Sequence, residues 1–354
     1  MKVLGIFRGF PGLGRVVAGV TLIEELRDLY NCEIRAISYL QGNKYLAQKG
    51  FTKLRDASPM DYCSIGLLPT NKMGVFIHST IKNFEPDLII VDGEPLIIQS
   101  IKISHPNSKI VALLNPSDVD NPANDAEAMA YFNALYSLSD LTIVHGLRNI
   151  VDHYHHTNII CIPTIIRDEI TSLNCEQGKN IYCILGGGTE NSSQEFIDTS
   201  TKIAKLCINT ASEFSNIKIH ILCSCSVIAS ELTLLASPSN VIIHDELLTP
   251  NDIYLDAALI ITRSGRNTLS EVAYLGIPTI SFVSGDCYRI QEQRQNLKNL
   301  AYNNITEAGP MTTATELGEK IKHMISKRQM VNNRFIRGNE LALNAIINLL
   351  YNNK

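Results

Sequence analysis

The sequence lacks long apolar runs, dense basic blocks and a recognisable signal peptide. No window reaches the roughly 18 uninterrupted apolar residues that a membrane-spanning helix needs. The formal net charge is -4, and no group of Lys and Arg is dense enough to follow a phosphodiester backbone, so nucleic acid is not expected as the main partner. The amino-terminal apolar stretch is too short and too rich in glycine for a signal peptide, which predicts a cytoplasmic protein without a transmembrane segment.

The pattern of cysteines and histidines does not predict a metal site. The nine cysteines are scattered, and Cys161, Cys183 and Cys223 lie in apolar strand-like runs, as reduced, buried thiols do. Cys223 and Cys225 share one face of a predicted strand, but no second pair completes a zinc site. We therefore expect no metal and no other cofactor. A cluster of histidines without a further ligand is interpreted as a polar surface between domains: His153, His155 and His156.

What the sequence does contain is an alternation of short apolar runs and helical patterns. The apolar fraction of 45% is ample for real cores, and 354 residues suit two domains. Several strand-like runs are apolar on both faces, as in parallel sheets that helices cover on both sides. The predicted strands form two series, at 2–7, 33–39, 87–93, 109–115 and 141–146, then at 180–188, 217–223, 240–246, 258–265 and 278–283.

The two series predict an α/β fold of two doubly wound, Rossmann-like parallel-sheet domains that face each other across a cleft. We place the first domain at 1–165 and the second at 166–335, with the connection inside 153–180. An amphipathic helix at 336–354 is free to return to the first domain. Helices of the second domain are predicted near 192–215, 250–257, 267–275, 289–302 and 313–327.

Two glycine-rich loops follow predicted strands. Gly12 and Gly14 resemble the beginning of a dinucleotide fingerprint, but Val17 occupies the third glycine position and no acid closes the second strand, which disfavours an NAD site. This loop either lets a ligand approach the backbone or makes a tight turn. The second loop, Gly186 to Thr189, lacks the Gly-Lys-Ser/Thr ending of a P-loop. Three successive glycines are costly in backbone entropy, which favours the close approach of a phosphate over a plain turn.

The stretch ITRSGRNTLSE, at 261–271, suits an anion. Arg263 ends a strand, Gly265 permits a sharp corner, and Arg266 adds a second cation at a helix N-terminus. Glu271, one turn into the helix, is a pure acceptor that could take two hydrogen bonds from ribose hydroxyls. The alternative is structural, because Thr268 and Glu271 fit a capping box with Thr268 as N-cap.

These motifs resemble the donor-binding signature of the MurG-like glycosyltransferases, the family 28 group of GT-B enzymes. The likeness spans nearly the whole chain and is most specific in RSGRNTLSEVAYLGIPTISFV and RIQEQRQNLKNLA. It implies a GT-B fold in which the second domain holds a UDP-sugar without a metal. The expected nucleotide-sugar residues are Arg167, Gly186, Gly187, Gly188, Thr189, Ile243, His244, Arg263, Ser264, Gly265, Arg266, Asn267, Thr268, Glu271, Glu292, Gln293 and Asn296.

One position departs from the family pattern. Family members usually carry a histidine, assigned as the catalytic base or near it, where this sequence has Arg15, and arginine cannot take up a proton near neutral pH. Either the base comes from elsewhere, or the acceptor hardly needs one, or Arg15 binds an acidic acceptor, or activity is lost. Asp92 and Glu94 follow a buried strand on one side of an extended chain and are the candidate bases, with a helix cap or loop contact as the alternative for Asp92. The expected acceptor-side residues are Gly12, Gly14, Arg15, Asn115 and Asp118, the last two also compatible with a turn.

The resemblance implies the inverting transfer of a sugar, expected to be an N-acetylhexosamine, from a UDP-sugar to an unidentified small-molecule, lipid or glycan acceptor. A nucleotide-sugar hydrolase and a non-catalytic nucleotide-sugar-binding subunit are the alternatives, which the missing histidine keeps open. The oligomeric state is also open, with a homodimer as one alternative.

Overall fold

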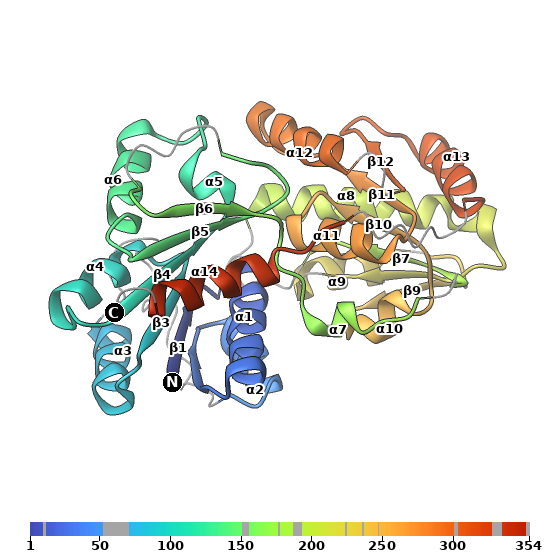
Figure 1. Cartoon of the computed structure of the whole chain (residues 1–354). Coiled ribbons are helices and arrows are strands. Elements are labelled where there is room, and N and C mark those ends of the chain that lie inside the picture. The colour runs from blue at the N-terminus through green and yellow to red at the C-terminus, as the bar shows by residue number, and fades with distance from the viewer. Residues whose placement is uncertain are drawn as a thin grey trace. The chain divides into compact units, whose positions relative to one another are not determined.

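The computed structural model describes residues 1–9, 12–51, 71–150, 156–175, 178–186, 193–223, 225–235, 237–246, 248–300, 304–327 and 335–351. The chain divides into two compact units (Figure 1): unit 1 comprises Met1–Ile165 with Arg337–Lys354, and unit 2 comprises Ile166–Ile336. Each unit contains one six-stranded sheet whose neighbouring strands all run parallel. The predicted α/β fold with two Rossmann-like parallel sheets is confirmed.

The sheet of unit 1 has the strand order β2-β1-β3-β4-β5-β6. Its strands are β1 (Lys2–Phe7), β2 (Glu33–Ile37), β3 (Leu88–Asp92), β4 (Lys109–Leu114), β5 (Leu141–His145) and β6 (Ile159–Ile162). Every residue of β3 and β5 is buried, which is why these runs lack the polar alternation of a half-exposed strand. One face packs against α1 (Gly14–Tyr30), α2 (Gln41–Gln48) and α14 (Asn339–Tyr351). The other packs against α3 (Asn71–Phe84), α4 (Pro95–Ser104), α5 (Pro116–Val119) and α6 (Ala126–Tyr136).

The last helix, α14, belongs to unit 1 although unit 2 precedes it in the chain. Leu343 and Ile346 of α14 join the apolar cluster that α1 forms with the sheet. Asn339, at the beginning of α14, is buried and donates its side-chain amide to Glu25 of α1 at 2.6 Å. The amide of Gly338 donates to the carbonyl of Thr164 at 2.9 Å. The start of α14 is therefore held by both backbone and side-chain hydrogen bonds.

Replacing Gly338 by alanine should destabilise unit 1, because the new Cβ would lie 2.0 Å from the carbonyl oxygen of Pro163. Moving backbone to relieve such a clash costs about 1–3 kcal/mol. Gly309→Ala is the matched control, since a Cβ at Gly309 meets nothing within 4 Å. Urea denaturation of the two variants should show a loss for Gly338→Ala alone. Equal stability of both variants would contradict this account of how the start of α14 is held on unit 1.

The sheet of unit 2 has the order β12-β11-β10-β7-β8-β9. Its strands are β7 (Asn180–Ile184), β8 (Ile219–Leu222), β9 (Val241–His244), β10 (Ala257–Arg263), β11 (Thr279–Phe282) and β12 (Ile305–Ala308). One face packs against α8 (Gln194–Thr210), α9 (Ser226–Thr233) and α13 (Ala314–Ile325). The other packs against α7 (Asp168–Thr171), α10 (Pro250–Tyr254) and α11 (Arg266–Leu275). The remaining long helix, α12 (Cys287–Asn299), buries none of its residues and lies next to β12.

The structure corrects the prediction at two edge strands. β6 and α7 lie within the segment 153–180 that was interpreted as a connection, and β12 was not predicted. Each of these strands has four residues, which is too short for a periodicity to identify. Cys161 lies on the edge strand β6 and is exposed, contrary to the prediction, whereas Cys183 and Cys223 are buried as predicted.

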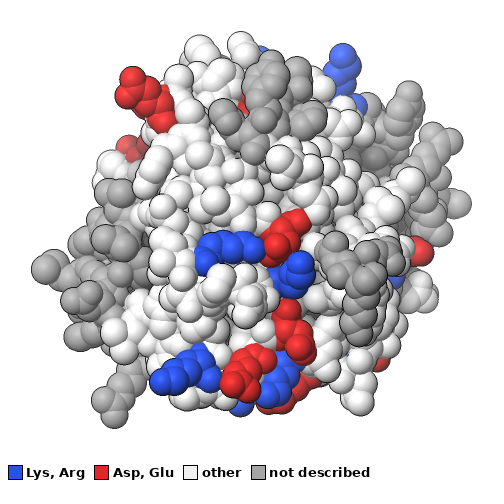
Figure 2. Space-filling model, turned by 60° about the vertical axis from the view of Figure 1, so that its left-hand side comes forward, with Lys and Arg blue, Asp and Glu red and all other residues white. Residues whose placement is uncertain are grey.

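None of the described helices is long and apolar enough to cross a membrane. Figure 2 shows one face on which the described Lys and Arg are few and mostly lie beside Asp or Glu. On this face, the described cations do not form a continuous basic track.

Candidate functional site

Each sheet has one point at which the order of its strands changes direction. In unit 1 this point lies between β1 and β3, and in unit 2 it lies between β7 and β10. Open parallel sheets bind ligands beyond the carboxyl ends of strands at such points. The strands end there at Phe7 and Asp92 in unit 1, and at Ile184 and Arg263 in unit 2. Most predicted site residues follow one of these four strand ends.

The corner between β10 and α11 contains the centre of the ITRSGRNTLSE stretch. Ser264 Oγ lies 2.7 Å from Ser281 Oγ and donates to the Phe282 carbonyl at 2.9 Å, which fixes the end of β10 on β11. Gly265 is exposed, and a Cβ there would meet only the Arg263 carbonyl oxygen, at 3.9 Å. The fold itself thus has room for a side chain at this position. A glycine here instead keeps the backbone accessible to a ligand.

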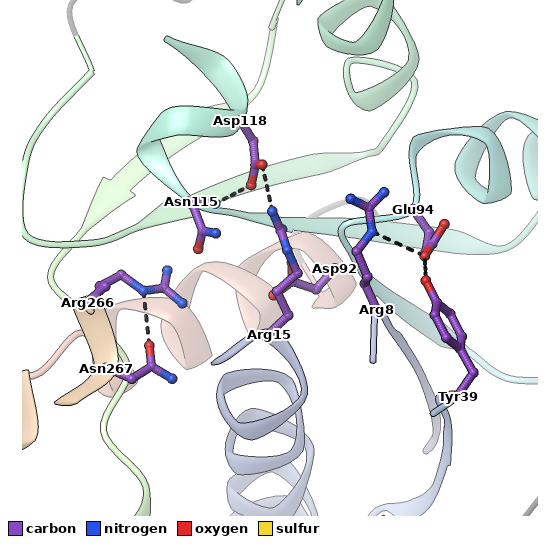
Figure 3. Close-up of polar contacts among 9 residues, drawn as sticks. All are labelled: Arg8, Arg15, Tyr39, Asp92, Glu94, Asn115, Asp118, Arg266 and Asn267. Carbon is purple, nitrogen blue, oxygen red and sulfur yellow. Dashed lines mark hydrogen bonds and ion pairs between the residues drawn. The ribbon is translucent and has the colours of Figure 1, made fainter. Parts of the chain in front are cut away.

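The capping-box interpretation of this corner is wrong. α11 begins at Arg266 with Gly265 as N-cap, so Thr268 is the third helical residue. The helix starts earlier because Leu269 already donates its amide to the Gly265 carbonyl at 3.0 Å. Arg266 Nε donates to Asn267 Oδ1 at 3.1 Å within the first turn (Figure 3). The amide groups and the positive dipole end of this turn suit an anionic ligand.

Glu271 is almost completely buried and joins three elements of unit 2. Its two oxygens lie 2.8 Å from Arg167 Nε and 3.1 Å from Arg167 Nη2, and Tyr254 donates its hydroxyl to Glu271 at 2.7 Å. Burial, and then the charge of Glu271, raise the pKa of Tyr254 well above its usual value, which keeps the hydroxyl protonated as a donor. The structure thus brings Arg167 and Glu271 together. The sequence reasoning missed Tyr254, because nothing local in the short helix α10 indicates a contact with a residue so distant in sequence.

The glycine loop after β7 is described only at its beginning. Gly186 has a φ of 128°, a conformation that side chains rarely allow, so the glycine is required by the backbone. Gly187, Gly188 and Thr189 lie outside the described residues. α8 follows this loop and begins with Ser193 as N-cap, whose side chain accepts the amide of Phe196 at 3.3 Å.

Ile243 and His244 end the edge strand β9 and are both half-buried. His244 Nε2 lies 2.9 Å from His220 Nδ1, and the two rings stack with centroids 5.2 Å apart. The His220 ring stacks in turn on Tyr182 with a centroid distance of 4.5 Å. Burial, and then the neighbouring His244, lower the pKa of His220 below its usual value. Rings on β7, β8 and β9 therefore form one stacked row at this edge of the sheet.

α12 carries the remaining predicted sugar-side residues. Gln293 holds the loop before the helix, because its amide donates to the Ser284 carbonyl at 2.9 Å and its oxygen accepts from the Ser284 amide at 2.8 Å. Glu292 and Asn296 are half-buried. Arg289, in the first turn of α12, is exposed.

In unit 1, Arg15 bridges two carboxylates (Figure 3). Its Nη1 lies 2.5 Å from Asp92 Oδ1, and its Nη2 lies 2.6 Å from Asp118 Oδ1. Asp92 is fully buried, and the side chain of Arg15 is 15% exposed. Burial by itself would lower the pKa of Arg15, but Asp118 and Asp92 raise it well above its usual value. Burial would likewise raise the pKa of Asp118, but Arg15 and the Asn115 amide hold it below its usual value. Arg15 and Asp118 are therefore both charged at neutral pH.

Glu94 lies in a second, adjacent group with Arg8 and Tyr39 (Figure 3). Tyr39 donates its hydroxyl to Glu94 Oε1, and Arg8 Nε approaches the same oxygen at 3.4 Å. Among the described residues, none hydrogen-bonds to Glu94 Oε2, and the side chain is 15% exposed. The prediction that Asp92 and Glu94 share one side of an extended chain is wrong, because Gly93 has a φ of 79° and turns the backbone between them. The two carboxylates consequently have different partners.

The other predicted acceptor-side residues also follow the carboxyl ends of strands in the unit 1 sheet. Gly14 is the first residue of α1, and Gly12 precedes it in the loop after β1. Asn115 caps the short helix α5, and its amide donates to Asp118 Oδ2 at 2.8 Å. The turn proposed for Asn115 and Asp118 is thus a helix cap, and Asp118 also binds Arg15.

The histidine cluster was interpreted as a polar surface between domains, and His156 does not fit that interpretation. His156 is buried in unit 1, where its ring nitrogens lie 3.1 Å from Thr142 Oγ1 and 3.0 Å from Asn133 Oδ1. His153 and His155 lie outside the described residues. Within the described ranges, no group of three or more His, Cys, Asp or Glu could hold a metal ion.

Comparisons with known proteins agree with this architecture. Residues 202–343 match the model of the glycosyltransferase family 28 C-terminal domain. None of the curated proteins matches the sequence. Among solved structures, the chain is similar to the glycosyltransferase SnogD from Streptomyces nogalater (16% identity, TM-score 0.63, 99% of each chain covered). It is also similar to Acinetobacter baumannii MurG (14% identity, TM-score 0.56, 99% of this chain and 100% of that chain covered).

A third similar structure is the UDP-GlcNAc 2-epimerase from Methanocaldococcus jannaschii in complex with UDP-GlcNAc and UDP (12% identity, TM-score 0.62, 99% of this chain and 100% of that chain covered). At these identities the structural likeness shows the fold, which is GT-B. The family match and the fold confirm the resemblance to MurG-like family 28 glycosyltransferases, and together they support a glycosyltransferase.

Proposed function

We propose that the protein transfers a sugar, an N-acetylhexosamine, from a UDP-sugar to an acceptor, with inversion at the anomeric carbon. The observation that carries the proposal is the corner at Gly265 with Glu271 one turn behind it, at the switch point of unit 2. This corner lies inside the segment that matches the family 28 C-terminal domain. Unit 2 is therefore assigned the donor, and unit 1 the acceptor.

The donor would bind with its diphosphate at the N-terminus of α11 and its ribose at Glu271. Amide groups and the dipole of a helix N-terminus stabilise the negative charge that develops on the leaving UDP. Both oxygens of Glu271 are engaged by Arg167 and Tyr254 in the described structure. Ribose hydroxyls would share or replace these contacts, since each carboxylate oxygen can accept about two hydrogen bonds. Arg167 would then turn toward a phosphate.

Glu94 is the proposed general base. It would take over the role of the family histidine, whose position is occupied here by Arg15. Three carboxylates stand at the switch point of unit 1, and Arg15 occupies Asp92 and Asp118. Glu94 Oε2 has no hydrogen-bond partner among the described residues and is the oxygen placed to accept a proton from an acceptor hydroxyl. Tyr39 and Arg8 would hold the carboxylate in position. Because Arg15 is already neutralised by two acids, it is not assigned to an acidic acceptor.

Calorimetry with UDP-GlcNAc, UDP and GDP tests the proposal, with UDP compounds expected to bind more tightly than GDP. Incubation of the protein with UDP-GlcNAc alone should leave the donor almost intact, because the proposed reaction needs an acceptor. Rapid release of UDP and free sugar would identify a hydrolase instead. Conversion to a second UDP-sugar, seen by proton NMR, would identify an epimerase, an outcome included because epimerases share the fold. Absence of any binding at millimolar UDP would refute the assignment of unit 2.

A further inference from the structure

Two arginines at the carboxyl edge of the unit 1 sheet are matched by three carboxyl groups (Figure 3). Arg15 spans Asp92 and Asp118, with Nη1 2.5 Å from an oxygen of the first and Nη2 2.6 Å from an oxygen of the second. Arg8, directly after β1, has its Nε 3.4 Å from Glu94 Oε1. The positive charge of both guanidinium groups is therefore already compensated by the protein itself.

A third arginine at this edge follows the same pattern. Arg148 comes after β5, and its guanidinium reaches the Asp120 carboxylate at 3.3 Å and the Asp120 carbonyl at 2.6 Å. Only 11% of the Arg148 side chain is exposed. Proteins that bind a phosphate with arginine turn the forked donors of the guanidinium toward the ligand. Here the donors with described contacts point at acids of the chain instead.

The backbone keeps Arg8 and Arg15 in these positions. A Cβ at Gly93 would lie 2.8 Å from Arg15 Cδ and 3.0 Å from Arg8 Cβ, so the main chain at Gly93 packs against both side chains. A phosphate could use the two Nη groups of Arg15 only by displacing Asp92 or Asp118. Asp92 is fully buried, and a buried carboxylate without its cation is strongly unfavourable.

The atoms that remain for an acceptor suit a hydroxyl group. Glu94 Oε2 has no hydrogen-bond partner among the described residues, and its carboxylate would repel an anion placed next to it. Burial, and then Glu94, raise the pKa of Tyr39 well above its usual value, so that its hydroxyl stays neutral. A neutral hydroxyl on the acceptor would instead donate to Glu94 Oε2 without any cost of like charges.

We infer that the acceptor carries no phosphate or carboxylate beside its reacting hydroxyl, as in an unphosphorylated sugar, a polyol or a neutral aglycone. This inference rests on the proposed function, because it assumes that unit 1 binds the acceptor. In the transfer, the hydroxyl oxygen forms a bond to the anomeric carbon and its proton passes to Glu94. The bond from that carbon to UDP breaks, and its electron pair leaves with UDP.

Calorimetry with pyrophosphate on protein saturated with UDP tests the inference. UDP fills the anion site proposed for unit 2, so that pyrophosphate reports on unit 1, and the unmodified protein should bind none at millimolar concentration. Asp118→Asn should bind pyrophosphate at least roughly tenfold more tightly, because it takes one negative charge from Arg15 yet can still accept the Asn115 amide. The matched control is Asp28→Asn, which removes the acid from the exposed Arg27 and should bind no pyrophosphate.

Glu94→Gln is a second variant, which relieves Arg8 of its acid in the same way and does not depend on the folding of Asp118→Asn. Tight binding of pyrophosphate to the unmodified protein, or no gain in either variant, would overturn the inference. So would faster release of UDP from UDP-GlcNAc with glucose 6-phosphate or glycerol 3-phosphate than with glucose or glycerol. Failure of the unmodified protein to bind UDP is a different result, which refutes the assignment of unit 2 and leaves the pyrophosphate comparison measurable without UDP.

Discussion

Replacing Glu271 by alanine is expected to weaken the binding of UDP by about 100-fold and to lower the free energy of unfolding by about 3–5 kcal/mol. The first effect follows from the loss of the acceptor for the ribose hydroxyls. The second follows because Arg167 would lose its carboxylate while only 19% of its side chain is exposed. Calorimetry with UDP and urea denaturation measure the two effects separately.

Two further variants distinguish binding from folding. Glu271→Gln keeps the shape of the side chain and should lose less stability than Glu271→Ala, yet it should still bind UDP poorly. Tyr254→Phe removes the neutral hydroxyl but keeps the Arg167–Glu271 pair, so it should cost about 1 kcal/mol of stability and change UDP affinity only slightly. A Glu271→Gln protein that binds UDP like the unmodified one would disprove the role of this carboxylate.

Replacing Arg15 by methionine is expected to cost about 3–5 kcal/mol of stability at pH 7, because it leaves two carboxylates without their cation in a buried place. The apolar methionine fills much of the same space, so the effect reports mainly on charge. Lys102→Met is the control, since its pair with Asp140 is 23% and 22% exposed and should be worth under about 1 kcal/mol. Urea denaturation at pH 7 compares the two.

The same variant should respond to pH in a characteristic way. In the unmodified protein the pKa of Asp118 is held low, so its stabilising contribution is present above the unfolded pKa of about 3.9 and is lost as the pH falls through the folded pKa. Without Arg15, burial would raise the pKa of Asp118 instead. The variant would then recover relative to the unmodified protein on acidification, and the difference in stability should shrink from pH 7 to pH 4. A difference that is independent of pH would show that Asp118 is not the affected group.

The fold was predictable from the sequence because its central strands are buried on both faces. Runs such as 88–91 and 110–114 are apolar throughout, and their alternation with amphipathic helices leaves few topologies other than two parallel sheets. The four-residue edge strands β6 and β12 escaped prediction because short, partly exposed strands have little periodicity. The start of α11 was misplaced for a related reason: a local capping pattern at Thr268 competed with a turn that the end of β10 had already determined.

The site was predictable only where its residues are adjacent in the sequence. The stretch from Arg263 to Glu271 indicated an anion corner, but its buried partners come from elsewhere in the chain. Tyr254 contacts Glu271 from another helix, and Arg263 contacts Phe196 from α8. In unit 1, Arg15 bridges Asp92 and Asp118, which lie 77 and 103 positions away from it in the sequence. Such contacts follow from the topology of the sheet and leave no trace in local spacing.

The position of α14 bears on how a newly made chain folds. Unit 1 is discontinuous, since its last helix is synthesised only after the whole of unit 2. Until then the apolar side of α1 and its sheet lacks the cover that Leu343 and Ile346 provide, and Glu25 lacks Asn339. The amino-terminal half therefore cannot complete its core on the ribosome before the other half has emerged. A chain that stops at residue 336 would expose an aggregation-prone apolar surface to chaperones and proteases.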